Sequence, residues 1–241
     1  MIYLKGYAKD EEYVFMECKM VDLNDFFNGK FNFDALRDCL DDEWKKQGLK
    51  DVDLRVSYNA MLTKEQGEEL FNKAVALNSQ TQKLTKRGGV FVKKILKRYD
   101  ERFLDLINSG LDVNFCLSEN GVKFNLLNQS LKMLDYNRLT LLLSAGAKPQ
   151  IDLDNPQNDS LVIAAHSGDL SAFCVVLSYL DKPIENHWLI GLLLSTNNPN
   201  EYVMGQMMAR RGEQLGDNID SLIVKSQKGF ENKFLGQRIE K

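Results

Sequence analysis

The sequence predicts an α+β protein in two parts: a small α/β domain with a parallel sheet over residues 1–95, then an all-α stack of helical repeats over residues 96–241. Two observations predict this division. The first part alternates strand-like and helix-like segments, which is the order of a parallel α/β layer. The second part repeats a helix-ending phrase at spacings of 36, 34 and 32 residues, which is typical of repeat architectures.

Composition sets the limits of any functional reading. The chain has 241 residues, of which 44% are hydrophobic and 27% charged, so it can bury a sizeable core. Its net charge of −3 gives no overall attraction for nucleic acid, and we expect no direct nucleic-acid binding. No apolar run has the length of a membrane helix or the form of a signal peptide. We therefore expect a cytoplasmic protein with no membrane partner.

Two segments of the first part have the composition of strands. Residues 13–19 form a short apolar run, and residues 52–58 alternate strictly between apolar and polar side chains. Residues 88–96 fit either a third strand or the start of a helix, and the pattern leaves both open.

Two helices are predicted between and after these strands. Residues 33–47 have helical period, with an apolar side to be buried against the strand at 52–58 and an acidic side left in solvent. The expected buried set is Phe33, Leu36, Cys39, Leu40 and Trp44. Thr63 and Gln66 have the spacing of a capping box, which predicts that a second helix begins there.

The run NFDALRDCL at residues 32–40, followed by a strand and then by a helix opening at residues 62–63, resembles the barstar-like immunity family. The resemblance covers about residues 1–95. It implies a barstar-like fold, in which this helix and the loop before it enter the active site of a ribonuclease toxin and acids replace the RNA phosphates. By position, Asp34 and Asp38 are the acids that would face the toxin.

The acidic stripe suits this role on physical grounds. Acids one helical turn apart are about 6 Å from each other, close to a phosphate spacing, and can bind a basic cluster through charge-assisted hydrogen bonds. Arg37 stands where the family has an aromatic residue. The alternative is a solvated helix face with no binding role. The candidate toxin-binding residues are Phe31, Asp34, Arg37, Asp38, Asp41 and Asp42.

The repeated phrase of the second part includes Gly110 and Gly146, and a related helix and glycine turn precede its third copy. A helix, turn, helix and loop unit of this period resembles a degenerate ankyrin repeat. The resemblance implies stacked helix pairs that bind proteins through inner helices and loop tips. We expect turns at Gly110, Gly146, Gly168, Gly212 and Gly229.

A basic segment lies at the junction of the two parts. Residues 81–103 carry 8 bases and 2 acids, interleaved with apolar residues. This segment fits a surface for nucleic acid or for an acidic partner, and it also fits a solvated face beside a buried element, which we favour.

No catalytic or metal-binding pattern is found. The four cysteines, Cys18, Cys39, Cys116 and Cys174, form no CxxC pair and are expected to be small core residues. His166 and His187 are the two histidines, and each is expected to satisfy local backbone groups. Phosphate-loop, nucleophile-elbow and zinc-protease motifs are absent. We therefore expect no enzyme activity and no cofactor.

The resemblance to the barstar-like family, together with the absence of catalytic motifs, implies a bacterial immunity protein that binds a secreted nuclease toxin and occludes its active site. The alternative is an ankyrin-type protein-interaction scaffold in which the first domain is a structural cap. Both readings need a protein partner and no catalytic residue.

Overall fold

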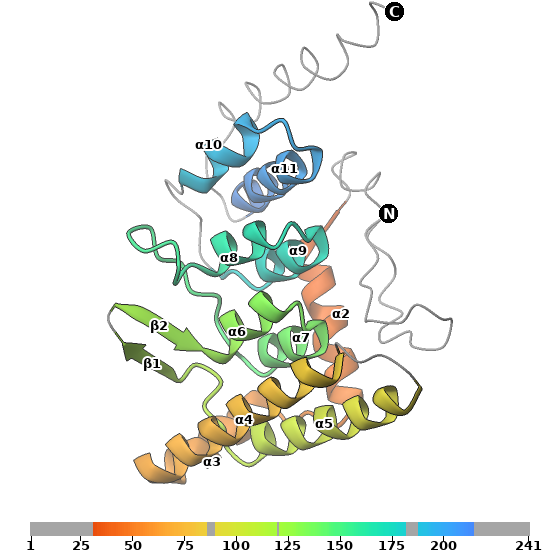
Figure 1. Ribbon diagram of the computed structural model, residues 1–241, viewed down its shortest axis with the longest axis vertical. Helices are drawn as coiled ribbons and strands as arrows, with labels where there is room; N and C mark the ends of the chain where they lie inside the picture. The colour runs from red at the N-terminus through yellow and green to blue at the C-terminus, as the bar shows by residue number, and fades with distance from the viewer. Residues whose placement is uncertain (1–30, 86–89, 120, 182–187, 215–241) are drawn as a thin grey trace, which may run out of the picture.

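The computed structural model describes residues 31–85, 90–119, 121–181 and 188–214. These segments are mostly helical (Figure 1). In chain order the elements are α2 (Phe33–Lys46), α3 (Val52–Met61), α4 (Lys64–Thr85), α5 (Val90–Asn108), β1 (Cys116–Glu119), β2 (Val122–Asn125), α6 (Leu126–Met133), α7 (Tyr136–Ser144), α8 (Ser160–His166), α9 (Leu170–Ser178), α10 (Trp188–Ser195) and α11 (Pro199–Gln214).

The predicted parallel sheet, and with it the barstar-like fold, is wrong. Within the described ranges the sheet consists of β1 and β2, which form an antiparallel hairpin. Residues 52–58 lie in the helix α3, and the predicted strand at 13–19 lies outside the described residues. A strand requires a neighbour to complete its backbone hydrogen bonds, whereas a helix completes them within itself. The alternating apolar residues Val52, Leu54 and Val56 accordingly stay 47–61% exposed on α3.

The later helices form stacked antiparallel pairs, α6–α7, α8–α9 and α10–α11, above the longer pair α4–α5 (Figure 1). Three expected turns are confirmed, because Gly110, Gly146 and Gly168 have φ values of +99°, +95° and +70° and follow helices. The turn expected at Gly212 is wrong, since α11 continues to Gln214. Gly229 lies outside the described residues.

Short polar side chains begin most helices of the stack. Asp159 and Asp169 accept hydrogen bonds from the first backbone N–H groups of α8 and α9, and Asn125 and Asp135 do the same for α6 and α7. Each cap satisfies donors that would otherwise have no partner. The capping box at α4 is confirmed as well: the backbone N–H of Thr63 donates to Gln66 Oε1 at 2.9 Å, and that of Gln66 donates to Thr63 Oγ1 at 3.3 Å.

Helix α2 crosses the outer helices α7 and α9 of two successive pairs (Figure 1). Its predicted buried face is confirmed at Phe33, Leu36, Leu40 and Trp44, while Cys39 is half-buried. The predicted packing partner is wrong, because this face lies on α7 and α9 rather than on residues 52–58. The buried residues of α2 and of the repeats belong to one continuous core.

The basic segment covers the end of α4 and most of α5. The sequence pattern of residues 88–96 fits a strand or a helix. The described part of this segment, from Val90 onward, is helical. Lys97, Arg98 and Arg102 lie exposed on α5. Neither α5 nor any other helix in the described ranges is long and apolar enough to cross a membrane.

Candidate protein-interaction face

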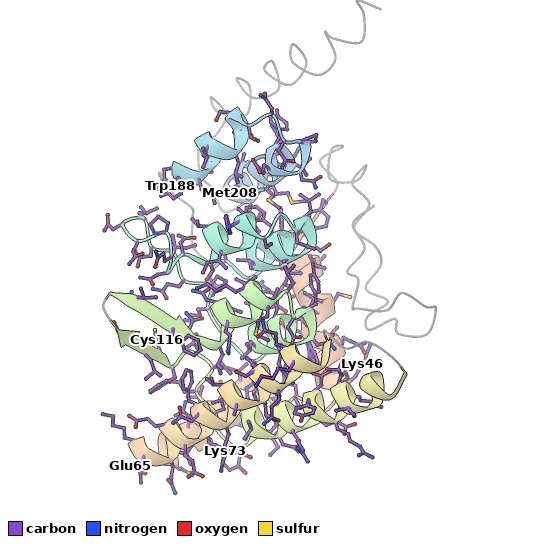
Figure 2. The ribbon with its side chains drawn as sticks, in the orientation of Figure 1. Lys46, Glu65, Lys73, Cys116, Trp188 and Met208 are labelled. Atoms are coloured by element: carbon purple, nitrogen blue, oxygen red, sulfur yellow. The ribbon has the colours of Figure 1, made fainter. Side chains whose placement is uncertain are left out.

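Outside α3 and α5, exposed apolar side chains gather where the loops of the stack project. They belong to the β1–β2 hairpin, to the loop between α7 and α8, and to the start of α10. The hairpin and the loop extend to the same side of the stack (Figure 1), and Cys116 and Trp188 are seen on that side in Figure 2. We call this surface the loop-tip face. Its apolar residues, each 37–45% exposed, are Leu117, Val122, Phe124, Ile151, Leu153 and Trp188.

A buried asparagine joins the hairpin to the following loop. Asn158 is 1% exposed, and its Oδ1 accepts a hydrogen bond from the backbone N–H of Lys123 at 2.8 Å. Its Nδ2 donates to the carbonyl of Gly121 at 3.2 Å and to Asp152 Oδ2 at 3.2 Å. Asn155 Nδ2 also donates to the Gly121 carbonyl, at 3.0 Å. The hairpin is therefore held to the loop by directional bonds.

A second asparagine fixes the chain before β1. Asn114 Nδ2 donates to the carbonyl of Gly146 at 3.0 Å, and its Oδ1 accepts from the backbone N–H of Lys148 at 2.8 Å. Asn108 makes the same two bonds with Gly48 and Lys50, at 3.0 and 3.1 Å. In both places one amide side chain bridges the glycine turn that ends a helix. The bonds of Asn114 tie the chain before β1 to the start of the loop that follows α7.

A cavity of about 260 Å³ lies at the base of the hairpin. Its wall combines apolar groups with amides and one lysine. Lys148 is exposed and forms no ion pair within the described ranges. The lining residues are Val113, Asn114, Cys116, Asn125, Leu127, Lys148, Pro149 and Gln150.

The acids predicted to bind a toxin lie on α2, and two of them contact the stack. Arg211 is 1% exposed and its Nη1 lies 3.0 Å from Asp34 Oδ1. Arg37 bridges Asp34 at 3.6 Å and Asp181 at 3.5 Å. Asp41 accepts a 2.6 Å hydrogen bond from the Tyr179 hydroxyl. Burial, followed by this carboxylate, raises the pKa of Tyr179, so the hydroxyl stays protonated and donates.

The other predicted site residues differ in exposure. Asp38 and Asp42 are exposed and, among the residues described, form no ion pair. They are one turn apart on the outer side of α2. Phe31 is half-buried, and its ring meets the edge of Phe33 at a centroid distance of 4.9 Å. The structure thus separates the predicted set into residues that hold α2 to the stack and residues that face solvent.

The described residues contain no group of three or more His, Cys, Asp or Glu able to hold a metal ion. Cys174 is buried, which raises its thiol pKa to about 12 and leaves it unreactive. Cys39 is half-buried and Cys116 exposed, so the expectation of buried cysteines fails at Cys116. The hairpin turns its side chain toward the cavity rather than toward the core. His166 is exposed, and Cys18 and His187 lie outside the described residues.

Sequence reasoning missed the loop-tip face. A signal was present: Leu117, Val122 and Phe124 alternate with polar residues on either side of an Asn-Gly pair at 120–121, the strongest short-range pattern for a hairpin. No family model, no curated protein and no solved structure matches the chain.

Proposed function

We propose that this protein is an interaction scaffold that binds a partner protein through the loop-tip face. The observation that carries the proposal is a set of exposed apolar side chains on loops whose bases are fixed by hydrogen bonds from asparagines, one of which, Asn158, is buried. Scattered apolar residues are ordinary on a surface, but several on one side of a supported projection favour recognition. Rigid loops lose little conformational entropy when a partner binds. The stacked helix pairs favour the same use, as does the resemblance of the sequence to a degenerate ankyrin repeat.

The test is selection of linear 12-residue peptides by phage display on the immobilised full chain. Selected peptides are then measured against a variant that carries Leu117→Glu and Leu153→Glu, which places two charges on the face. We expect binding to fall by about tenfold or more, because each charge must be desolvated beside apolar groups.

The matched control carries Leu54→Glu and Val56→Glu on α3, where both side chains are more than half exposed. It should bind like the parent chain. If peptides bind both variants equally well, the loop-tip face is not the binding surface.

A second candidate is inhibition of a secreted nuclease toxin by the outer side of α2. Asp38 and Asp42 support it, because both are exposed, without an ion pair in the described part of the chain and one turn apart. Acids so placed can stand in for two phosphates in a basic active site. Asp34 and Asp41 are already engaged in contacts with Arg211 and Tyr179.

Toxicity rescue in cells that express a nuclease toxin encoded beside this gene separates the two candidates. If α2 inhibits the toxin, Asp38→Ala with Asp42→Ala should abolish rescue, while Leu117→Glu with Leu153→Glu should not. The opposite pattern would assign inhibition to the loop-tip face.

A further inference from the structure

The two edges of the β1–β2 hairpin are unequal. The register pairs Ser118 with Lys123 and Cys116 with Asn125. At Lys123 the backbone N–H points away from β1, because it donates to Asn158 Oδ1 at 2.8 Å. The carbonyl of Gly121 on this side accepts from Asn155 and Asn158. The outer edge of β2 is therefore covered by the loop that follows α7.

The outer edge of β1 is open. In an antiparallel ladder the two residues of a pair share the same orientation, so Ser118, opposite Lys123, also turns its backbone N–H and C=O away from the hairpin. Two residues earlier, Cys116 does the same. Within the described ranges no hydrogen bond reaches these outward groups. An edge strand with free donors and acceptors is a template for another strand.

The side chains around this edge differ between the two faces of the hairpin. Leu117, Val122 and Phe124 share one face and leave 45%, 39% and 37% of their surface exposed. The opposite face carries Cys116 and looks onto the cavity that Lys148 lines without an ion pair in the described part of the chain. One face thus exposes three apolar side chains, and the other offers a cation without an ion pair in the described part of the chain.

We propose that the partner protein adds an extended strand to the free edge of β1, with apolar side chains packed on the Leu117 face and a carboxylate directed to Lys148. This inference rests on the proposed function and names its binding mode. Strand addition draws affinity from backbone bonds, and alternate side chains supply specificity. A protein strand fits the edge better than a nucleic acid does, because the edge presents amide donors and acceptors alternately beside an apolar face.

The experiment uses the display-selected peptides that depend on the loop-tip face, measured by fluorescence anisotropy with the full chain. Ser118→Pro removes the outward N–H and leaves the ladder bonds of β1 and β2 untouched, since Ser118 does not donate to β2. We expect it to weaken binding about tenfold or more. Ser118→Ala is the matched control, because it keeps the N–H, and it should change affinity less than about twofold.

Two further measurements keep the inference testable if Ser118→Pro disturbs the hairpin. N-methylation of single peptide amides should abolish binding at alternate positions only, because every second N–H of an added strand faces β1. Lys148→Glu should weaken a peptide that carries a carboxylate and leave its amide analogue unaffected.

The outcomes separate this inference from the function beneath it. Face-dependent peptides that bind Ser118→Pro normally and tolerate N-methylation everywhere would overturn strand addition and leave the interaction face in place. Failure to select any face-dependent peptide would overturn the proposed function itself.

Discussion

At the scale of single residues, buried polar side chains link neighbouring helices through ion pairs and hydrogen bonds. Arg138 is fully buried, with its Nη1 3.1 Å from Asp100 Oδ1 and its guanidinium 4.3 Å from the ring of Phe103. It joins α7 to α5, and its Nη2 lies 3.4 Å from Thr81 Oγ1 on α4. A buried ion pair adds little net stability but penalises any arrangement that separates its members. These contacts therefore specify how the pairs sit on one another.

Asn158 allows a direct test of how much such a buried polar link stabilises the fold. Asn158→Ala should lower the free energy of unfolding by about 1–3 kcal/mol, because the backbone N–H of Lys123 and the carbonyl of Gly121 lose a buried partner. Urea denaturation measures the loss, and amide exchange at Lys123 should quicken. Gln157→Ala, in the same loop but exposed, should cost less than about 0.5 kcal/mol. Equal losses for the two variants would contradict the role given to Asn158.

The raised pKa of Asp100 predicts that the stability of the chain depends on pH. Burial raises the pKa of Asp100 from 3.8 to about 6, although Arg138 opposes the shift. The folded chain then holds a proton that the unfolded chain has released, so the contribution of Asp100 to stability is full below pH 4 and is lost as the pH rises to about 6. In the Asp100→Asn variant the side chain at position 100 does not titrate. We expect the stability of the parent, measured relative to Asp100→Asn, to fall between pH 4 and pH 6. A constant difference would contradict the raised pKa.

At the scale of elements, α2 acts as a brace across the stack. Its apolar face lies on α7 and α9, Trp44 Nε1 donates to Thr140 Oγ1 at 3.1 Å, and Arg211 of α11 lies against Asp34 and the carbonyl of Leu180. One helix thus contacts elements of three successive pairs. Asp34 and Asp41 were candidates for binding a partner, and in the structure both hold α2 to the stack.

Trp44 and Asp42 test the two sides of the brace. Trp44 is 1% exposed, so Trp44→Ala should cost about 3–5 kcal/mol through a large cavity and the loss of the hydrogen bond to Thr140 Oγ1. Asp42 is exposed, and Asp42→Asn should cost less than about 0.5 kcal/mol. Denaturant unfolding of both variants gives the comparison. Similar losses would show that the helix lies in another rotation about its axis.

At the scale of the whole molecule, one hydrophobic core runs from Phe33 on α2 to Met208 on α11. In a stack of repeats alone, each repeat contacts only the adjacent repeats, so the stack can unfold in stages. The brace adds contacts between residues far apart in sequence, such as Arg211 and Asp34. These long-range contacts favour a single cooperative transition.

Cooperativity can be measured with the two tryptophans. In a Trp188→Phe background the fluorescence reports on Trp44 of α2, while circular dichroism reports on all helices. We expect the two urea transitions to have the same midpoint, because α2 cannot leave without exposing the cores of the pairs it covers. A lower midpoint for fluorescence would mean that α2 detaches first and the stack persists without it.

Features that depend on neighbouring residues could be predicted from the sequence alone: the capping box at Thr63, the helical rotation that buries Phe33 and Trp44, and the glycine turns at Gly110, Gly146 and Gly168. Three features depend on contacts between distant parts of the chain: residues 52–58 are a helix, α2 packs on α7 and α9, and Asp34 contacts Arg211. Caps, turns and helical period are set by bonds within a few residues. A strand, by contrast, requires a partner elsewhere in the chain, and an apolar or acidic helix face shows only that it needs a neighbour or solvent, without showing which neighbour it has.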